Sequence, residues 1–157
     1  MGRPKLILHD LAALLATFPV NEGRPWRRIL SLMRFDHIGG LDMAWRALGG
    51  SQVLVAPPQE ITPEAVATTI LRLQVEVLLA TPNFLSLLLN SEAHRSRELR
   101  SLRIVSYGAA PVQASLLERL RSALPRVEFV PCFGTSESSA FPVPSFGEGV
   151  ALSNEGG

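Results

Sequence analysis

The sequence contains only one cysteine, Cys132, among its 157 residues. A single cysteine excludes an intrachain disulfide framework and a zinc site built from several cysteines. The 15 basic and 14 acidic residues leave a net charge of +1. The chain as a whole therefore has no basic field that would hold nucleic acid or an anionic membrane, and we expect no nucleic-acid partner.

Long apolar runs are also missing. No stretch of the sequence reaches the roughly 18 apolar residues that a membrane-spanning helix needs. Near the N-terminus His9 and Asp10 interrupt a short apolar run, which argues against a secretory signal. We expect a cytoplasmic chain without a membrane span, and the 46% hydrophobic content indicates a folded core rather than a disordered segment.

Several catalytic motifs are absent as well. The sequence has no Gly-x-Ser-x-Gly elbow, no phosphate loop ending in Gly-Lys-Ser/Thr, no Gly-x-Gly-x-x-Gly and no histidine pair at metal-ligand spacing. These absences argue against a common hydrolase, a P-loop nucleotidase and a dinucleotide-dependent dehydrogenase.

The chain does contain a regular alternation of short apolar runs with amphipathic stretches. The apolar runs predict strands at residues 29–33, 53–55, 75–80, 102–106 and 127–130, with a further strand at 5–8. The amphipathic stretches predict helices at residues 11–18, from Gly40 to Gly49, and after the start signals at Thr62, Thr81 and Pro111. This order predicts an α/β fold, with right-handed βαβ units forming a mainly parallel sheet flanked by helices.

Two segments depart from that rhythm. Residues 91–101 are polar and charged, which predicts a solvated connection. Beyond Pro131 the pattern stops, so we divide the chain into a regular βαβ region at about 5–131 and an irregular tail at 132–157. The helix that begins near Gly40 is expected to bury the stripe Leu41, Ala44, Trp45 and Leu48.

Three loops should meet at the carboxyl edge of this sheet, where α/β proteins bind ligands. They follow the strands at 29–33, 102–106 and 127–130, and they hold polar or very small residues. A flat ring can lie against the backbone of Gly108, Ala109 and Ala110, because these residues have little or no side chain. In the third loop Glu137 offers a carboxylate of the kind that Mg²⁺ takes beside phosphates.

Each feature also has a simpler structural interpretation. Gly-Ala-Ala-Pro at 108–111 is common as a plain strand-to-helix connection, and Gly-Thr-Ser-Glu at 134–137 as a polar loop. His37 alone is more often a hydrogen-bonded structural histidine, and Cys132 a packed thiol.

Taken in order, however, four segments resemble the motifs of adenylate-forming ligases, the superfamily of acyl-CoA synthetases, luciferase-like enzymes and peptide-synthetase adenylation domains. Residues 2–5 (Gly-Arg-Pro-Lys) resemble the end of the family's phosphate loop, and residues 35–40 (Phe-Asp-His-Ile-Gly-Gly) its aromatic/His-Gly segment. Residues 107–111 (Tyr-Gly-Ala-Ala-Pro) resemble its adenine-binding turn, and residues 133–137 (Phe-Gly-Thr-Ser-Glu) its Tyr-Gly-x-Thr-Glu motif.

The resemblance implies a role for each matching residue. The implied catalytic residues are His37, Ser136 and Glu137, and Glu137 would also hold Mg²⁺. The implied nucleotide-binding residues are Lys5, Gly108, Ala109, Ala110, Pro111, Phe133, Gly134, Thr135 and Ser136. Three of them depart mildly from the family pattern, since Ala109 replaces a glycine, Phe133 a tyrosine and Ser136 a threonine.

The resemblance further implies a partial AMP-binding domain over residues 1–157, because the family's later ribose-binding aspartate and its lid with the catalytic lysine do not appear. The expected parent activity is ATP-dependent acid–thiol (acyl-CoA) ligation, in which a carboxylic acid such as a fatty acid becomes acyl-AMP and then passes to CoA. We expect ATP or AMP, Mg²⁺ and CoA as cofactors, and an isolated chain that is inactive. The alternative is a nucleotide-binding or interaction module without catalysis, and exposed sheet edges would favour self-association in either case.

Overall fold

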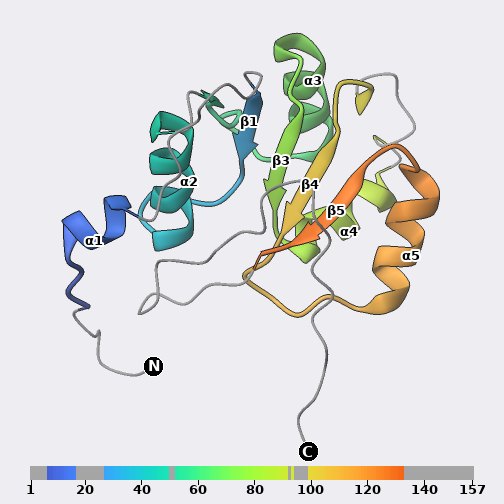
Figure 1. The fold of residues 1–157 in the computed structure, drawn as a ribbon. Coiled ribbons are helices and arrows are strands. Elements are labelled where there is room, and N and C mark those ends of the chain that lie inside the picture. The colour runs from blue at the N-terminus through green and yellow to red at the C-terminus, as the bar shows by residue number, and fades with distance from the viewer. Residues whose placement is uncertain (1–6, 17–26, 50–51, 92, 94–98, 133–157) are drawn as a thin grey trace, which may run out of the picture.

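A computed structural model describes residues 7–16, 27–49, 52–91, 93 and 99–132 (Figure 1). Five strands form one sheet in the order β2-β1-β3-β4-β5, and every neighbouring pair is parallel. In chain order they are β1 (Arg28–Ser31), β2 (Val53–Val55), β3 (Val77–Ala80), β4 (Ile104–Tyr107) and β5 (Glu128–Pro131). The predicted α/β class with a parallel sheet is therefore confirmed.

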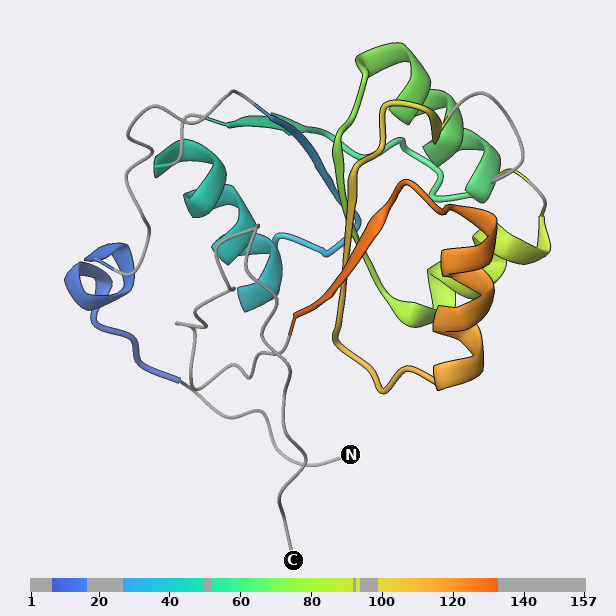
Figure 2. The same cartoon turned by 45° about the vertical axis from the view of Figure 1, so that its right-hand side comes forward.

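Helices cover both faces of the sheet, as Figures 1 and 2 show. The helices are α1 (Leu11–Ala16), α2 (Ile38–Gly49), α3 (Pro63–Leu73), α4 (Pro82–Asn90) and α5 (Ala114–Ala123). The helices α3, α4 and α5 lie together on one side of the sheet, and α2 lies on the other. This is the layer order that consecutive right-handed βαβ crossovers produce when they run to both sides of a parallel sheet.

The core sits on both sides of β3 and β4, whose residues are all buried. Side chains of successive strand residues point to opposite faces. Leu78 joins the larger cluster under α3, α4 and α5, whereas Val77 and Leu79 join the smaller cluster under α2. Burial on both faces explains why these strands are continuous apolar runs rather than alternating ones.

Two predicted helix starts are confirmed with their caps. The Thr62 hydroxyl accepts a hydrogen bond from the Ala65 backbone N–H at 3.2 Å, and the Thr81 hydroxyl accepts one from the Phe84 N–H at 3.3 Å. In both cases a proline follows at the first helical turn, where its missing N–H leaves no donor unsatisfied.

The third helix start is wrong by three residues. Helix α5 begins at Ala114, not at Pro111, and its N-cap Gln113 is still extended, with φ −79° and ψ 137°. A left-handed residue, Ala109 with φ 64°, turns the chain beforehand. The helix therefore starts only after the left-handed turn at Ala109 and the extended N-cap residue Gln113.

The apolar stripe predicted for α2 is only partly buried, with Ala44 and Trp45 half-buried. Met43 and Ala47 are buried, whereas Leu41 and Leu48 are 41% and 75% exposed. Met43 packs in the cluster under α2, beside Ile29 and Val77. The composition of the helix allows either face to be apolar, and the sheet selects the one that carries Met43.

Two predicted segments differ from the structure. Leu99, within the stretch expected to be a solvated connection, is buried in the main core cluster. Residues 7 and 8 are not part of a strand, and α1 ends at Ala16. The remaining parts of the predictions for 5–8 and 11–18 fall outside the described residues.

Candidate functional site

The carboxyl ends of β3, β4 and β5 lie in register. Tyr107 pairs with Ala80 on one side and with Pro131 on the other, so all three strands end at the same level. The residues that follow them, Gly108 and Cys132 among them, are therefore brought side by side at one edge of the sheet. This is the edge at which the sequence predicts a ligand site.

The loop after β1 forms a turn that leads directly into α2. The His37 N–H donates to the Arg34 carbonyl oxygen at 3.2 Å, and the His37 carbonyl accepts from the N–H groups of Gly40 and Leu41 at 3.0 and 3.1 Å. His37 is therefore the residue that precedes α2, and its side chain is exposed at the carboxyl edge.

Close packing fixes this turn against the first turn of α2. A Cβ on Gly40 would lie 2.1 Å from the Arg34 carbonyl oxygen, whereas one on Gly39 would meet nothing within 4 Å. Only the second glycine of the pair is therefore required by the backbone. Within the loop, Arg34 Nε donates to Asp36 Oδ1 at 3.0 Å, and this hydrogen bond lowers the pKa of the Asp36 carboxyl.

The loop after β4 passes from a buried glycine to an exposed turn. Gly108 is buried, and Ala109, Ala110 and Pro111 are exposed. Ala109 has φ 64°, a left-handed conformation that favours glycine and that few non-glycine residues adopt. An alanine held in this conformation is backbone strain, and such strain occurs preferentially at binding sites.

The third loop begins at Cys132, which packs against the second loop. Its N–H donates to the Tyr107 carbonyl at 2.8 Å, and a Cβ on Gly108 would lie 2.5 Å from its Sγ. Burial raises the pKa of the Cys132 thiol, a hydrogen bond from Ser106 lowers it, and the charge of Asp42 adds to the rise. The thiol thus lies among β4, α2 and the turn at 108–111.

Asp42 is a charged residue near this site that the sequence motifs do not identify. It is half-buried on α2, and the neighbouring Met43 and Cys132 belong to the same apolar cluster, so the start of the third loop lies close to α2. A signal is present in the sequence, because Asp42 is the single acidic residue of a mostly apolar helix that follows the His-Gly segment.

A cavity of about 250 Å³ opens beside the second loop, between the first turns of α4 and α5. Its lining residues are Pro82, Asn83, Ser86, Pro111, Gln113, Ser115, Leu116 and Arg119. Of the described residues expected to bind nucleotide, Pro111 lines this cavity, whereas Gly108, Ala109 and Ala110 do not. The cavity therefore adjoins the described part of the predicted site.

The structure brings together part of the predicted set. His37 and residues 108–111 lie at the carboxyl edge, where Cys132 joins them. Lys5, Phe133, Gly134, Thr135, Ser136 and Glu137 fall outside the described residues. Among the residues that the structure describes, no group of three or more His, Cys, Asp or Glu side chains is arranged to hold a metal ion.

Comparisons with known proteins point to one family. A family model described as AMP-binding enzyme matches residues 1–151. The chain is 31% identical over 129 residues to a 4-coumarate–CoA ligase-like protein of Arabidopsis thaliana, a match that covers 82% of this chain and 22% of the relative. The chain thus spans about a fifth of the length of that relative.

Solved structures give the same picture. The amide bond synthetase McbA from Marinactinospora thermotolerans is 28% identical, with a TM-score of 0.67 over 80% of this chain and 25% of that one. The N-terminal domain of FACL13 from Mycobacterium tuberculosis gives a TM-score of 0.74 at 19% identity, over 88% of this chain and 35% of that one. The second likeness is one of fold.

Proposed function

The chain belongs to the AMP-binding enzyme family, and from that premise we propose that it forms part of an ATP-dependent acid–thiol ligase. In this proposal a carboxylate attacks the α-phosphate of ATP, and acyl-AMP and pyrophosphate form. The acyl group then passes to a thiol, for which we propose CoA. The chain contributes the adenine-binding turn and the loops that border the reacting phosphate.

The observation that supports this proposal best is the pairing of Gly108 with Cys132. It joins the turn at 108–111 to Cys132, the residue that precedes the 133–137 motif. A flat adenine ring is proposed to lie against this turn, where Ala109 and Ala110 present backbone and methyl groups only. The strained Ala109 fits the interpretation, since the strain keeps the turn in one conformation before a ligand arrives.

We assign the other roles from the sequence motifs. Ser136 would donate its hydroxyl to the AMP phosphate, and Lys5 would place its ammonium group near the leaving phosphates. His37, exposed at the same edge, would contact the acyl or phosphate oxygen. Glu137 would hold Mg²⁺, which neutralises phosphate charge when it is bound. The contribution of the protein is positioning and charge stabilisation.

The acid and the completeness of the reaction are further proposals. We propose a fatty acid or a related apolar carboxylic acid as the substrate. Because the plant relative is named a 4-coumarate–CoA ligase-like protein, 4-coumarate should be assayed as a second candidate acid. We also propose that the 157-residue chain does not complete the cycle alone, since it spans about a fifth of that relative. Carboxylate-dependent ATP–pyrophosphate exchange by the purified chain would contradict this second proposal.

Equilibrium titration with AMP and ATP tests the nucleotide role. We expect saturable binding to the wild-type chain and its loss in Ala110→Phe, because the exposed ring would occupy the space over the turn. The matched control is Ala13→Phe, an equally exposed alanine on α1. Equal affinity in both variants, or no binding at millimolar nucleotide, would overturn the proposal.

A further inference from the structure

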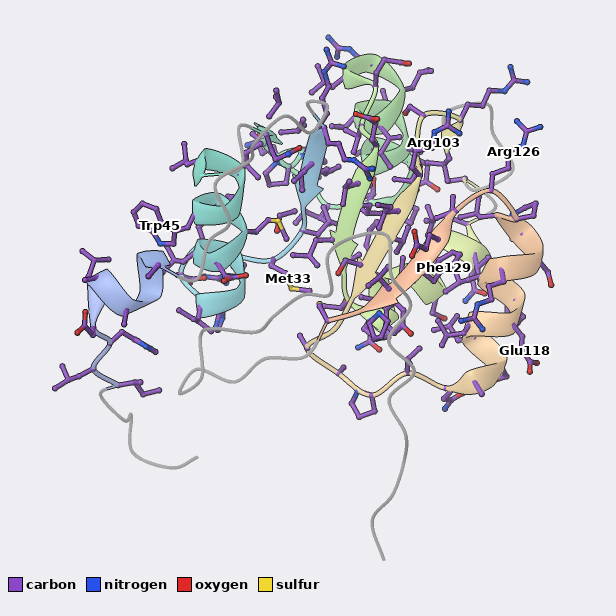
Figure 3. All side chains as sticks on the ribbon, viewed as in Figure 1. Met33, Trp45, Arg103, Glu118, Arg126 and Phe129 are labelled. Carbon is purple, nitrogen blue, oxygen red and sulfur yellow. The ribbon has the colours of Figure 1, made fainter. Side chains whose placement is uncertain are left out.

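The edge of the sheet opposite the site is lined by arginines. One of these residues starts β1, one lies in the last turn of α3, and three lie in the segments that precede β4 and β5. All five side chains are exposed: Arg28, Arg72, Arg100, Arg103 and Arg126. We call this set the arginine edge. Figure 3 shows Arg103 and Arg126 near one another at this end of the sheet.

Backbone hydrogen bonds hold the arginine edge in one row. The Glu76 N–H donates to the Arg28 carbonyl at 3.0 Å, and the Arg103 N–H donates to the Glu76 carbonyl at 2.8 Å. The Glu128 N–H continues the row by donating to the Arg103 carbonyl at 2.8 Å. The turn that carries Arg100 is fastened to the end of α3, because the Ser101 hydroxyl donates to the Val75 carbonyl at 2.8 Å.

The positive charge of this row is only partly balanced. Among the described residues, the row itself carries two carboxylates, Glu76 and Glu128, and the arginine edge carries five guanidinium groups. Within the described ranges, none of these guanidinium groups lies within ion-pair distance of a carboxylate, and the ion pair that is present joins Arg34 to Asp36 at the other edge. The net charge of the whole chain thus conceals a local excess of positive charge.

Exposed leucines lie beside these arginines. Leu71 and Leu73, on either side of Arg72 in the last turn of α3, are 42% and 48% exposed. Gln74 ends the helix in a left-handed conformation, with its N–H directed to the carbonyls of Ile70 and Leu71. The end of α3 therefore presents apolar and cationic side chains together at the rim of the sheet.

We propose that the arginine edge, with Leu71 and Leu73, docks the protein onto a membrane surface rich in anionic phospholipids. Guanidinium groups form paired hydrogen bonds with phosphate oxygens, and the anionic leaflet attracts clustered basic residues. The leucines supply the shallow apolar insertion that an acidic peptide would not need. None of the seven described residues in this set is aromatic, so the set itself offers no ring on which the bases of single-stranded nucleic acid stack.

The orientation that follows keeps the nucleotide site open. The arginine edge lies at the amino ends of the strands, and His37 and residues 108–111 lie at the carboxyl ends. A chain docked in this way directs its candidate site away from the lipid. The inference does not depend on the proposed ligase activity, because it concerns a separate surface.

Flotation with phosphatidylcholine vesicles, with and without phosphatidylserine, tests the proposal without any nucleotide. We expect binding that requires phosphatidylserine and weakens with salt. The double variant Arg103→Gln/Arg126→Gln should lower partitioning by roughly fivefold for each arginine. The control Arg34→Gln/Arg119→Gln removes the same charge outside the arginine edge, from the loop after β1 and from the middle of α5, and should leave partitioning within twofold.

The leucine pair is tested in the same assay. Leu71→Ser/Leu73→Ser should lower partitioning and leave its salt dependence in place. The control Leu48→Ser/Leu87→Ser, at positions on α2 and α4 that are even more exposed, should leave partitioning unchanged. Circular dichroism of every variant verifies that it is folded.

Four binding results would overturn the proposal. They are no binding of the wild-type chain to phosphatidylserine vesicles, equal binding to phosphatidylcholine alone, equal loss in edge and control variants, or binding of polyglutamate or single-stranded DNA through these arginines without vesicle binding. A dimer that dissociates in Leu71→Ser/Leu73→Ser would also overturn it, because a second copy would then cover the leucines.

Discussion

Gly108 lies against Cys132 so closely that a Cβ on the glycine would be 2.2 Å from the Cys132 carbonyl oxygen. The two residues follow the paired ends of β4 and β5, where Tyr107 and Pro131 are in register. The absence of a side chain at Gly108 therefore lets the second and third loops meet. This contact fixes the spacing between the turn at 108–111 and Cys132, the residue that precedes the motif at 133–137.

Replacement of Gly108 by alanine should separate these loops. A Cβ would also lie 2.5 Å from Cys132 Sγ and 3.2 Å from the Cys132 carbonyl carbon, and this backbone cannot move away as a flexible side chain could. We expect Gly108→Ala to lower the free energy of unfolding by about 2 kcal/mol, as other overpacked sites do. Denaturant unfolding measures it, with Gly39→Ala as control because its Cβ meets nothing within 4 Å. An unchanged midpoint for Gly108→Ala would contradict the contact.

Ala109→Gly should have the opposite effect on stability. Relief of the left-handed strain is worth about 1–2 kcal/mol, and the greater freedom of glycine in the unfolded chain removes about 0.4–1 kcal/mol of that. The net expectation is a stabilisation of about 1 kcal/mol in the same unfolding experiment. Ala110→Gly is the control and should destabilise, since positive φ is found at Ala109 and not at Ala110. Destabilisation by Ala109→Gly would show that the turn is unstrained.

The capping threonines of α3 and α4 should contribute separately to stability. Thr62→Ala and Thr81→Ala each remove a hydroxyl that accepts from a backbone N–H, at 3.2 and 3.3 Å. We expect each to lower the free energy of unfolding by about 1 kcal/mol. Thr68→Ala, at an exposed position inside α3, should cost nothing measurable. A loss in Thr68→Ala equal to that in Thr62→Ala would indicate a general effect of removing threonine.

The reactivity of the only cysteine should follow its surroundings. Burial raises the pKa of the Cys132 thiol, so less thiolate is present at a given pH and alkylation by iodoacetamide should be slower than for a free thiol. Ser106→Ala should raise this pKa further, because the Ser106 hydrogen bond lowers it. Asp42→Asn should lower it, because the negative charge of Asp42 opposes the thiolate. The pH dependence of the alkylation rate measures the thiol pKa in the wild-type chain and in the two variants. The same pKa in all three proteins would show that neither Ser106 nor Asp42 acts on the thiol.

The strands of the sheet can be predicted from the sequence because burial requires apolar residues. Strands buried on both faces, such as β3 and β4, are largely apolar and are recognised as short apolar runs. The strand predicted at 53–55 has the same bounds as β2. Helix starts at Thr62 and Thr81 were predicted because a cap is a local interaction. The start of α5 was not, because Pro111 is a local signal that the left-handed turn at Ala109 overrides.

What depends on tertiary packing could not be predicted in this way. The buried face of α2 is chosen by the sheet, and Leu99 reaches the core from a polar stretch. The loops of the site were located by strand order alone, and His37 and residues 108–111 lie at the expected edge. The contact of Gly108 with Cys132 and the approach of Asp42 both depend on strand register and helix placement, which residue spacing does not encode.

The central claim is that an adenine nucleotide binds at the turn between β4 and α5. Its most direct test is a titration of the isotopically labelled chain with AMP, followed through the amide chemical shifts of every residue. We predict saturable shifts centred on Gly108, Ala109 and Ala110, with smaller ones at Cys132. Absence of shifts at millimolar AMP, or shifts confined to residues away from the carboxyl edge of the sheet, would contradict the account.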